Sequence, residues 1–332
     1  MKRLARRLAW SMFVVLATVT LAFLVETALP SDPARMIAGQ QAPPAAVAKV
    51  RKDLGLDRPL YVQYGRFLQR LVHVGPSAFE PRDPDHGTCG NLGPVHVDLG
   101  RSYQQRRPVI TILAERAPRT LLLAAAAAVI QALIGVTAGV VAASHRRRPA
   151  DHLFVGMSLL GVSAPTFLIG LLLQWVFAYR LRLFPIDGFG ETTSQHALSL
   201  VLPAMTLGIF GAAYYTRIVR DEMIGELGQD YVRTARAKGL SQVGVTLRHA
   251  LRNAMIPIVT MFGLEVGTLV GGAVVTESVF RWPGLGSLSV DAMLDRDGPL
   301  IMGCVILTSS VVVLSSLAVD LAYSALDPRV RR

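Results

Sequence analysis

The sequence predicts an all-α integral membrane protein with about six transmembrane helices and a long extracytoplasmic segment after the first of them. Three observations predict this class. Hydrophobic residues make up 52% of the 332 residues and charged residues only 17%, against about 25% charged in ordinary soluble domains. Apolar runs long enough for a helix to cross a bilayer, which takes about 20 residues, recur along the chain. The net charge of +11 gathers in short segments between these runs.

Six apolar segments are the predicted transmembrane helices. The first follows a basic start, as a signal peptide would, but its apolar run is longer than a typical signal sequence. It also ends in Glu26-Thr27-Ala28-Leu29-Pro30, a poor cleavage site for a signal peptidase, so we expect an uncleaved helix. The segments comprise residues 8–29, 117–143, 152–179, 197–216, 254–276 and 299–323.

Basic residues in the short loops predict the orientation of these helices. Basic residues lie before the first helix and directly after the second, as Arg146-Arg147-Arg148. They are also frequent in the loop after the fourth helix and at the end of the chain. The other side carries few. Because cytoplasmic loops are enriched in Lys and Arg, both termini are expected in the cytoplasm and residues 30–110 outside it. The same pattern explains the basic charge without nucleic acid as a partner.

The external segment is predicted to hold two short helices and a loop. Residues 44–54 form a helical pattern that Gly55 ends, and Pro59 can begin an amphipathic helix. That second helix is expected to lie on the bilayer surface or to pack on other helices. Residues 75–94 have no periodicity and are expected to form an exposed loop.

Small and acidic residues inside the spans suggest packing and pathway roles. Gly135 and Gly139 lie four residues apart, a spacing that lets helices approach closely in lipid, and we expect this packing to be within the chain. Glu265 lies within the fifth span, where a charge is costly and faces a cavity or a partner. It is therefore a candidate pathway residue, with a structural hydrogen bond as the alternative. Glu277, near a span end, is interpreted as structural.

Several enzyme signatures are absent from the sequence. It has no G-x-x-x-x-G-K-[ST] phosphate loop, no H-E-x-x-H and no G-x-S-x-G. We therefore expect no catalytic residues and no ATP hydrolysis by this chain. His86, Cys89 and His96 lack the second ligand pair of a zinc site, so no metal site is predicted.

The cytoplasmic loop of residues 221–252 is too long to be a mere connector. A helical pattern runs to Lys238, Gly239 can end it, and Ser241 can cap a second short helix. This helix–turn–helix is interpreted as a docking element for a cytoplasmic protein, with a solvated basic loop as the alternative.

The loop resembles the coupling loop of inner-membrane permease subunits of ATP-binding-cassette (ABC) importers, in the dipeptide/oligopeptide/nickel branch. Arg233-Thr234-Ala235 stands where the wider superfamily has Glu-Ala-Ala, a departure typical of this branch. Further residues resemble the branch as well, namely 54–60, 62–64, 98–102, 108–109, 277–286 and 326–329, and residues 75–97 look like an insertion. The resemblance assigns coupling to Tyr231, Arg233, Thr234, Ala235, Arg236, Ala237, Lys238, Gly239, Leu240 and Arg248.

The resemblance implies a fold and a division of labour. Residues 1–110 would hold the first helix and the extracytoplasmic segment, and residues 111–325 a type I ABC importer transmembrane domain. A second homologous permease subunit would complete the pathway. Two cytoplasmic ATPase domains would bind ATP and Mg²⁺, with no cofactor on this chain, and an extracytoplasmic binding protein would deliver the substrate. The protein would lie in the bacterial cytoplasmic membrane.

The substrate and the transporter class have alternatives. Di- and oligopeptides lead within the branch, and nickel, haem, glutathione or another small solute are possible. A secondary transporter would show an internal repeat, broken helices near the midplane or a carboxylate relay, none of which the sequence indicates. A membrane-embedded enzyme would need a cluster of His, Asp or Cys near one membrane face, and none is evident.

Overall fold

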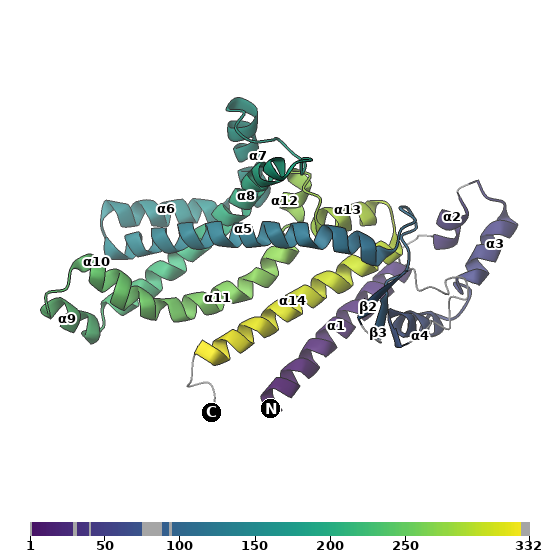
Figure 1. Ribbon diagram of the computed structural model, residues 1–332, viewed down its shortest axis with the longest axis horizontal. Coiled ribbons are helices and arrows are strands. Elements are labelled where there is room, and N and C mark those ends of the chain that lie inside the picture. Colours follow the sequence, from purple (N-terminus) through teal and green to yellow (C-terminus); the bar gives the residue numbers. More distant parts are fainter. Residues whose placement is uncertain (1, 29–31, 40, 75–87, 93–94, 327–332) are drawn as a thin grey trace. The chain divides into compact units, whose positions relative to one another are not determined.

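The computed structural model describes residues 2–28, 32–39, 41–74, 88–92 and 95–326 and is almost wholly helical (Figure 1). The chain falls into two compact units. The first contains residues 1–118 and 288–310, and the second contains residues 119–287 and 311–332. The boundary between them therefore falls inside two long helices, α5 (Val109–Ser144) and α14 (Gly298–Leu326).

The first unit packs an amphipathic helix against a transmembrane helix. Tyr64 and Phe67 of α4 lie against Val19 and Phe23 of α1, together with Met302 of α14. The predicted amphipathic helix therefore packs on other helices of the chain. The elements that lie wholly in this unit are α1 (Lys2–Ala28), α2 (Pro33–Ala38), α3 (Pro44–Asp53), α4 (Leu60–Leu71), β1 (Val72–Val74), β2 (Cys89–Leu92) and β3 (Val95–Asp98).

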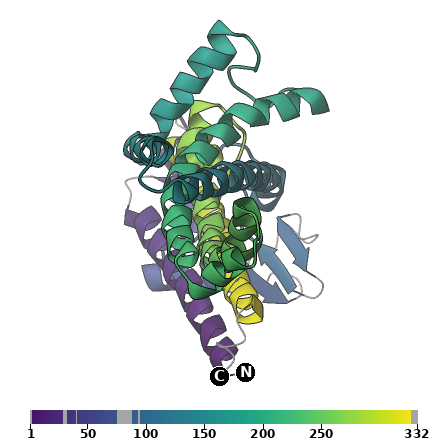
Figure 2. The ribbon, with the colours of Figure 1, turned by 90° about the vertical axis from the view of Figure 1, so that its left-hand side faces the viewer.

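A small antiparallel sheet occupies part of the predicted external loop. Its strand order is β1-β3-β2, with Val72 opposite Val97 and Leu92 opposite Val95. Figure 2 shows these strands in blue. The expectation of a loop over residues 75–94 was therefore wrong for Cys89–Leu92, because cross-strand pairing with β3 can order a strand of low intrinsic propensity. The rest of that range, residues 75–87 and 93–94, lies outside the described residues.

The regular elements among the described residues of the second unit are all helices. Together with α1, α5 and α14, its helices place helical structure on each of the six predicted spans. They comprise α6 (Pro149–Ser163), α7 (Thr166–Leu173), the π-helical η1 (Gln174–Arg180), α8 (Thr193–Leu227), α9 (Asp230–Ala237), α10 (Gln242–Gly244), the π-helical η2 (Val245–Ala250), α11 (Leu251–Gly272) and α12 (Val274–Val279), while α13 (Leu285–Leu294) crosses the unit boundary.

The described helices differ in how well they meet the length and apolarity of a membrane span. Val109–Ser144, Thr193–Leu227 and Gly298–Leu317 meet both, and a fourth span forms if α6 and the helix Thr166–Arg180 are one. These two are bent by 105°. Pro165 at the bend removes a backbone donor and clashes with the preceding turn, which breaks the helix. The sequence indicated no broken helix, so that expectation was wrong.

Helices α5 and α8 approach each other closely through glycine. A Cβ added at Gly135 would lie 2.7 Å from the Cβ of Tyr215, and one at Gly139 would lie 2.6 Å from the Cβ of Val219. The four-residue spacing therefore serves packing within the chain, as predicted, since small residues let helix backbones approach in lipid.

Candidate functional site

Helix α9 is a short amphipathic helix with one buried side. Val232 is 0% exposed and Ala235 is 5% exposed, whereas the other side chains of α9 are exposed. The two buried residues belong to an apolar cluster that also contains Val219 and Met223 of α8 and Val245 of η2. Burial of this side attaches α9 to the helices around it and leaves its polar side outward.

The structure divides the predicted first helix of the loop. Helix α8 ends at Leu227, the N–H of Gly228 bonds to the carbonyl of Gly225, and α9 begins at Asp230. One continuous helix to Lys238 was therefore a wrong expectation. A break turns α9 onto the apolar cluster, and burial of its two apolar residues stabilises the change in direction.

The predicted turn at Gly239 is confirmed. Gly239 has φ +80°, in the left-handed region, and a Cβ there would meet nothing within 4 Å. Backbone conformation, and not space, therefore favours glycine at this position. The predicted cap is confirmed too, because the Ser241 hydroxyl accepts a hydrogen bond from the N–H of Gly244 at 3.2 Å.

Beyond the cap, the chain continues without a break through η2 into α11. The predicted second short helix is therefore continuous with the fifth span. Val245 and Ala250 of η2 are buried, and Arg248 is exposed. A π-helix is rare and often occurs at functional sites.

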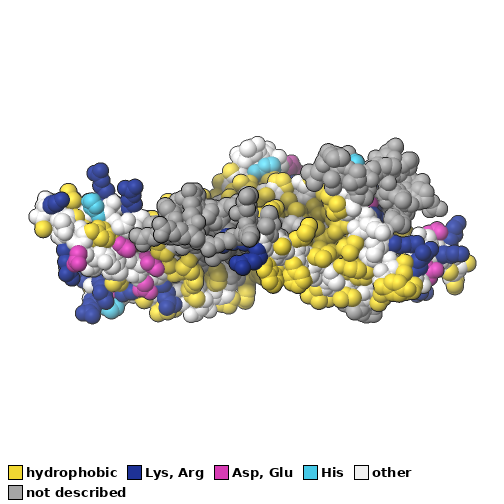
Figure 3. Space-filling model, turned by 90° about the horizontal axis from the view of Figure 1, so that it is seen from below, with side chains coloured by type: hydrophobic (Ala, Val, Ile, Leu, Met, Phe, Trp, Pro, Cys, Tyr) yellow, Lys and Arg dark blue, Asp and Glu magenta, His cyan; other side chains and the backbone are white. Residues whose placement is uncertain are grey.

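The exposed face of α9, α10 and η2, called here the coupling surface, mixes apolar and basic side chains. Its apolar members are Tyr231, Leu240, Val243 and Leu247, each between 38% and 67% exposed. Figure 2 views this end from the front, in green, and Figure 3 shows Lys and Arg side chains gathered at it. The other members are exposed residues predicted from the sequence, namely Arg233, Thr234, Arg236, Ala237, Lys238, Gly239 and Arg248.

Sequence reasoning missed Val243 and Leu247 as members of this surface. Their spacing of four residues, opposite the buried Val245 and Ala250, was the signal that could have found them. Conversely, Ala235 was predicted to belong to the site but is buried beneath it, so its side chain attaches α9 and does not face outward.

An ion pair joins two helices close to this surface. Asp151, at the start of α6, accepts hydrogen bonds from Nε of Arg220 at 2.6 Å and from its Nη2 at 3.0 Å. The same carboxylate accepts the N–H of Arg147 at 2.9 Å. The Asp151 side chain is 4% exposed and the Arg220 side chain 23%. This bidentate hydrogen bonding holds α6 against α8.

Residues 277–286, a further stretch that resembles the family, and the adjoining Ser287 are built around a buried carboxylate. Glu277 is 0% exposed and accepts hydrogen bonds from the Thr120 hydroxyl at 2.7 Å and from the N–H of Ser287 at 2.9 Å. The Thr120 oxygen in turn accepts the N–H of Leu285 at 2.7 Å. Trp282, also 0% exposed, donates from its indole to the carbonyl of Arg119. We call this region the Glu277 loop, and its contacts support the structural interpretation of Glu277.

The structure describes other residues considered in the sequence analysis only in part. Glu265 lies in α11, but its side chain is outside the described residues, so its pathway role stays a prediction. Among the described residues, no group of three or more His, Cys, Asp or Glu could hold a metal ion. His86 lies outside the described residues.

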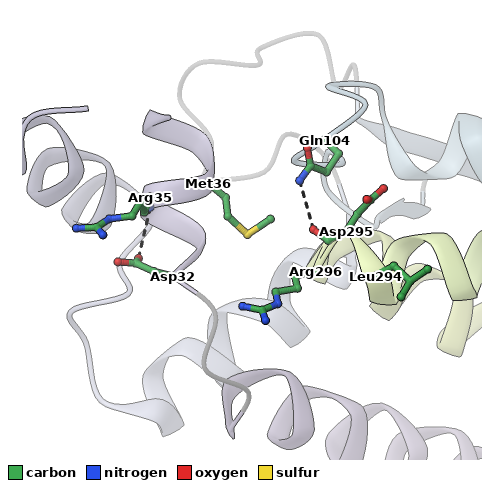
Figure 4. A pocket seen from close by; sticks show the side chains of 7 residues that line it. All are labelled: Asp32, Arg35, Met36, Gln104, Leu294, Asp295 and Arg296. Atoms are coloured by element: carbon green, nitrogen blue, oxygen red, sulfur yellow. Dashed lines mark hydrogen bonds between the residues drawn. The ribbon is translucent and has the colours of Figure 1, made fainter. Parts of the chain in front are cut away.

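A cavity of about 610 Å³ opens in the first unit (Figure 4). Asp32 accepts a hydrogen bond from Nη2 of Arg51 at 2.7 Å, and the Gln104 amide donates to the carbonyl of Asp295 at 3.3 Å. All its lining residues are at least partly exposed, which leaves its ligand chemistry undefined. They are Asp32, Arg35, Met36, Gln104, Leu294, Asp295 and Arg296.

Comparison with known proteins places the chain in a family. Residues 135–332 match the binding-protein-dependent transport system inner membrane component family, and residues 1–124 match the N-terminal region of such components. The chain is 40% identical over 326 residues to the glutathione transport system permease protein GsiC of Salmonella paratyphi A, covering 98% of this chain and 97% of the relative. It is also 40% identical to GsiC of Escherichia coli K12 over 311 residues, or 94% and 92% of the two chains.

A solved structure shares the fold. A chain of the MetNI methionine ABC transporter, in inward facing conformations, superimposes with a TM-score of 0.56 at 17% identity and covers 66% of this chain and 98% of that one. The predicted type I importer fold is therefore confirmed. With family matches over both parts of the sequence, the chain belongs to the binding-protein-dependent transport system inner membrane components and is a permease subunit of an ABC importer.

Proposed function

We propose that this chain forms half of the translocation pathway for a small peptide, with glutathione as the first substrate to test. A second permease subunit completes the pathway, and an extracytoplasmic binding protein delivers the cargo. Two separate ATPase domains bind ATP and Mg²⁺, so this chain hydrolyses none. Both termini lie in the cytoplasm, on the side of the basic loops, and Glu265 lines the pathway.

The coupling surface carries the proposal. Exposed apolar side chains such as Val243, which is 67% exposed, are costly at a water-facing end of a membrane protein unless a partner covers them. Basic neighbours such as Arg236 can hydrogen-bond carboxylates or carbonyls at the rim of a groove. Helix α9 is attached to packed helices through a buried apolar cluster, so a rigid-body movement of an ATPase docked on it has a route into those helices.

The relatives' names support the choice of substrate. They are described as glutathione permeases, and glutathione is itself a tripeptide, so it lies within the peptide class that the sequence resemblance implied. Nickel, haem and other solutes stay alternatives, because the binding protein selects the cargo. Uptake of labelled glutathione, of a dipeptide and of nickel into vesicles holding the complete importer separates these cases.

The experiment on the coupling surface replaces Gly239 by Val. A β-branched side chain at φ +80° is strained by about 1–2 kcal/mol, which distorts the turn between α9 and α10. We expect membrane insertion to be intact and ATPase copurification or substrate uptake to fall about tenfold. Gly239→Asn, which tolerates this backbone conformation, and Gly156→Val, where a Cβ meets nothing within 4 Å, are the controls. Full assembly and transport by Gly239→Val would remove the support for this surface.

A further inference from the structure

Helix α9 is attached to its surroundings in two different ways. Its underside is held by apolar contacts of Val232 and Ala235. Such contacts stabilise the helix but have no direction, so they define its tilt poorly. Its first turn is held by a polar contact, through the hydroxyl of Tyr231. A hydrogen bond is directional and can therefore fix an angle.

The Tyr231 hydroxyl joins three segments. It donates a hydrogen bond to Oε2 of Glu226, in the last turn of α8. Asn253, in the first turn of α11, forms a side-chain hydrogen bond to the same group. Burial raises the pKa of Tyr231, the Glu226 contact raises it further, and the Asn253 contact lowers it in part. A tyrosine hydroxyl, with an ordinary pKa of about 10, is protonated at neutral pH, and the shift is upward, so the group stays a donor.

The covalent connections alone do not fix α9 relative to both neighbours. Towards α8 they consist of Gly228 and Gln229. Towards α11 they pass through Gly239, at positive φ, and through the π-helical η2. Glycine turns bend readily, and a π-helical segment interrupts the regular α-helix. A push on α9 could therefore be absorbed in these connections before it reached α11.

We propose that the Tyr231 hydroxyl is a positioning group that holds α9 at a fixed angle to α8 and α11, so that a displacement of α9 moves both helices together. This inference rests on the proposed docking of an ATPase at the coupling surface. Tyr231 does not contact the cargo. It acts through Glu226 and Asn253. The residue is 38% exposed, so its ring stays available to the partner.

Tyr231→Phe tests the inference, because it removes the hydroxyl and keeps the ring. The complete importer, with its partner permease, ATPase and binding protein, is reconstituted in vesicles. ATPase copurification and the melting temperature are expected to stay close to those of the unmodified protein. The amount of substrate imported per ATP hydrolysed is expected to fall about tenfold, since a hydrogen bond to a charged group shifts an equilibrium by about this factor.

Variants of the acceptor sharpen the test. Glu226→Gln keeps a neutral oxygen acceptor for the hydroxyl and is expected to lower the ratio less than Glu226→Ala, which is expected to match Tyr231→Phe. The double variant Tyr231→Phe, Glu226→Ala should import as much substrate per ATP as either single variant, because both substitutions remove the same contact. Tyr61→Phe, which removes a hydroxyl from a residue that is 77% exposed on α4, is the matched control.

Two results would overturn the inference. One is an unchanged ratio of import to hydrolysis in Tyr231→Phe. The other is a loss of uptake that merely follows a loss of assembled complex, which would make the hydroxyl an ordinary stabilising group. Failure of the proposed function is distinguishable, since the unmodified chain would then not copurify with an ATPase at all.

Discussion

The coupling surface and the Glu277 loop both match the family in sequence, yet they are built in opposite ways. In the Glu277 loop the carboxylate and Trp282 are 0% exposed, and hydrogen bonds from Thr120 and Ser287 satisfy the carboxylate from within the chain. On α9 only Val232 and Ala235 are buried, and the other side chains point outward. A sequence match alone does not separate the two cases. Burial does: it shows that the first region is internal structure, and it leaves the second exposed to the partner proposed above.

The comparison predicts which substitutions destabilise the fold, and which leave the fold intact but impair ATPase assembly or transport. Substitutions in the Glu277 loop should lower stability and, through it, the amount of protein. Substitutions of exposed side chains on the coupling surface, Gly239 apart, should leave stability unchanged and reduce assembly or transport. Surface substitutions usually stay within about 0.5 kcal/mol, while disruption of a buried polar network costs several times more.

The largest effect is expected for Gly284→Val. A Cβ at this position would lie 2.2 Å from Oε1 and 2.5 Å from Oε2 of Glu277. The carboxylate would have to move and leave the donors of Thr120 and Ser287 unpaired inside the protein, at about 1–3 kcal/mol for each. We expect a loss of 3 kcal/mol or more, about the sum of two such terms, measured as a lower melting temperature in detergent and less protein in membranes. A stable, abundant Gly284→Val protein would refute the structural role of this loop.

A smaller loss of stability is expected when Asp151 is changed to Leu. Arg220 would lose Asp151 but keep Asp221, whose Oδ1 lies 2.9 Å from its Nη1. The loss should therefore fall below the about 3–5 kcal/mol that breaking a fully buried ion pair costs, since the Arg220 side chain is also 23% exposed. Thermal unfolding of the purified protein measures the effect. Asp151→Asn keeps an acceptor and should lose less. Equal melting temperatures for Asp151→Leu and the unmodified protein would show that this pair does not hold α6 on α8.

Local features were predictable from the sequence, because each depends on neighbouring residues. The helix Pro44–Asp53, the positive φ of Gly239 and the cap at Ser241 follow from propensity and capping rules alone. Helical structure over each of the six predicted spans follows from runs of apolar residues. The type I fold was reached through the resemblance of the motifs to a known family.

Features that depend on distant residues were not predictable. Asp151 and Arg220 lie 69 positions apart, and Thr120 and Glu277 lie 157 apart. No periodicity in the sequence reports such pairs. The break at Gly228 and the π-helical turn at Val245–Ala250 also escaped, because tertiary packing around Val232 and Val245 overrides a continuous helical pattern.

The smallest effect on stability, and the sharpest test of the comparison, is expected for Arg236→Glu. Arg236 is exposed at the end of α9, so reversing its charge should leave the melting temperature unchanged. Docking should weaken, because a cation that meets acidic or carbonyl groups of the ATPase becomes an anion that repels them.

Exposed charges are screened beyond about 8 Å at physiological ionic strength. Copurification of the ATPase with Arg236→Glu should therefore approach that of the unmodified protein as salt is raised, while both weaken in absolute terms. Arg58→Glu, which reverses an exposed charge between α3 and α4, is the control and should change nothing. A deficit for Arg236→Glu that is independent of salt would place the residue in a packed contact, and an unchanged copurification at low salt would remove it from the coupling surface.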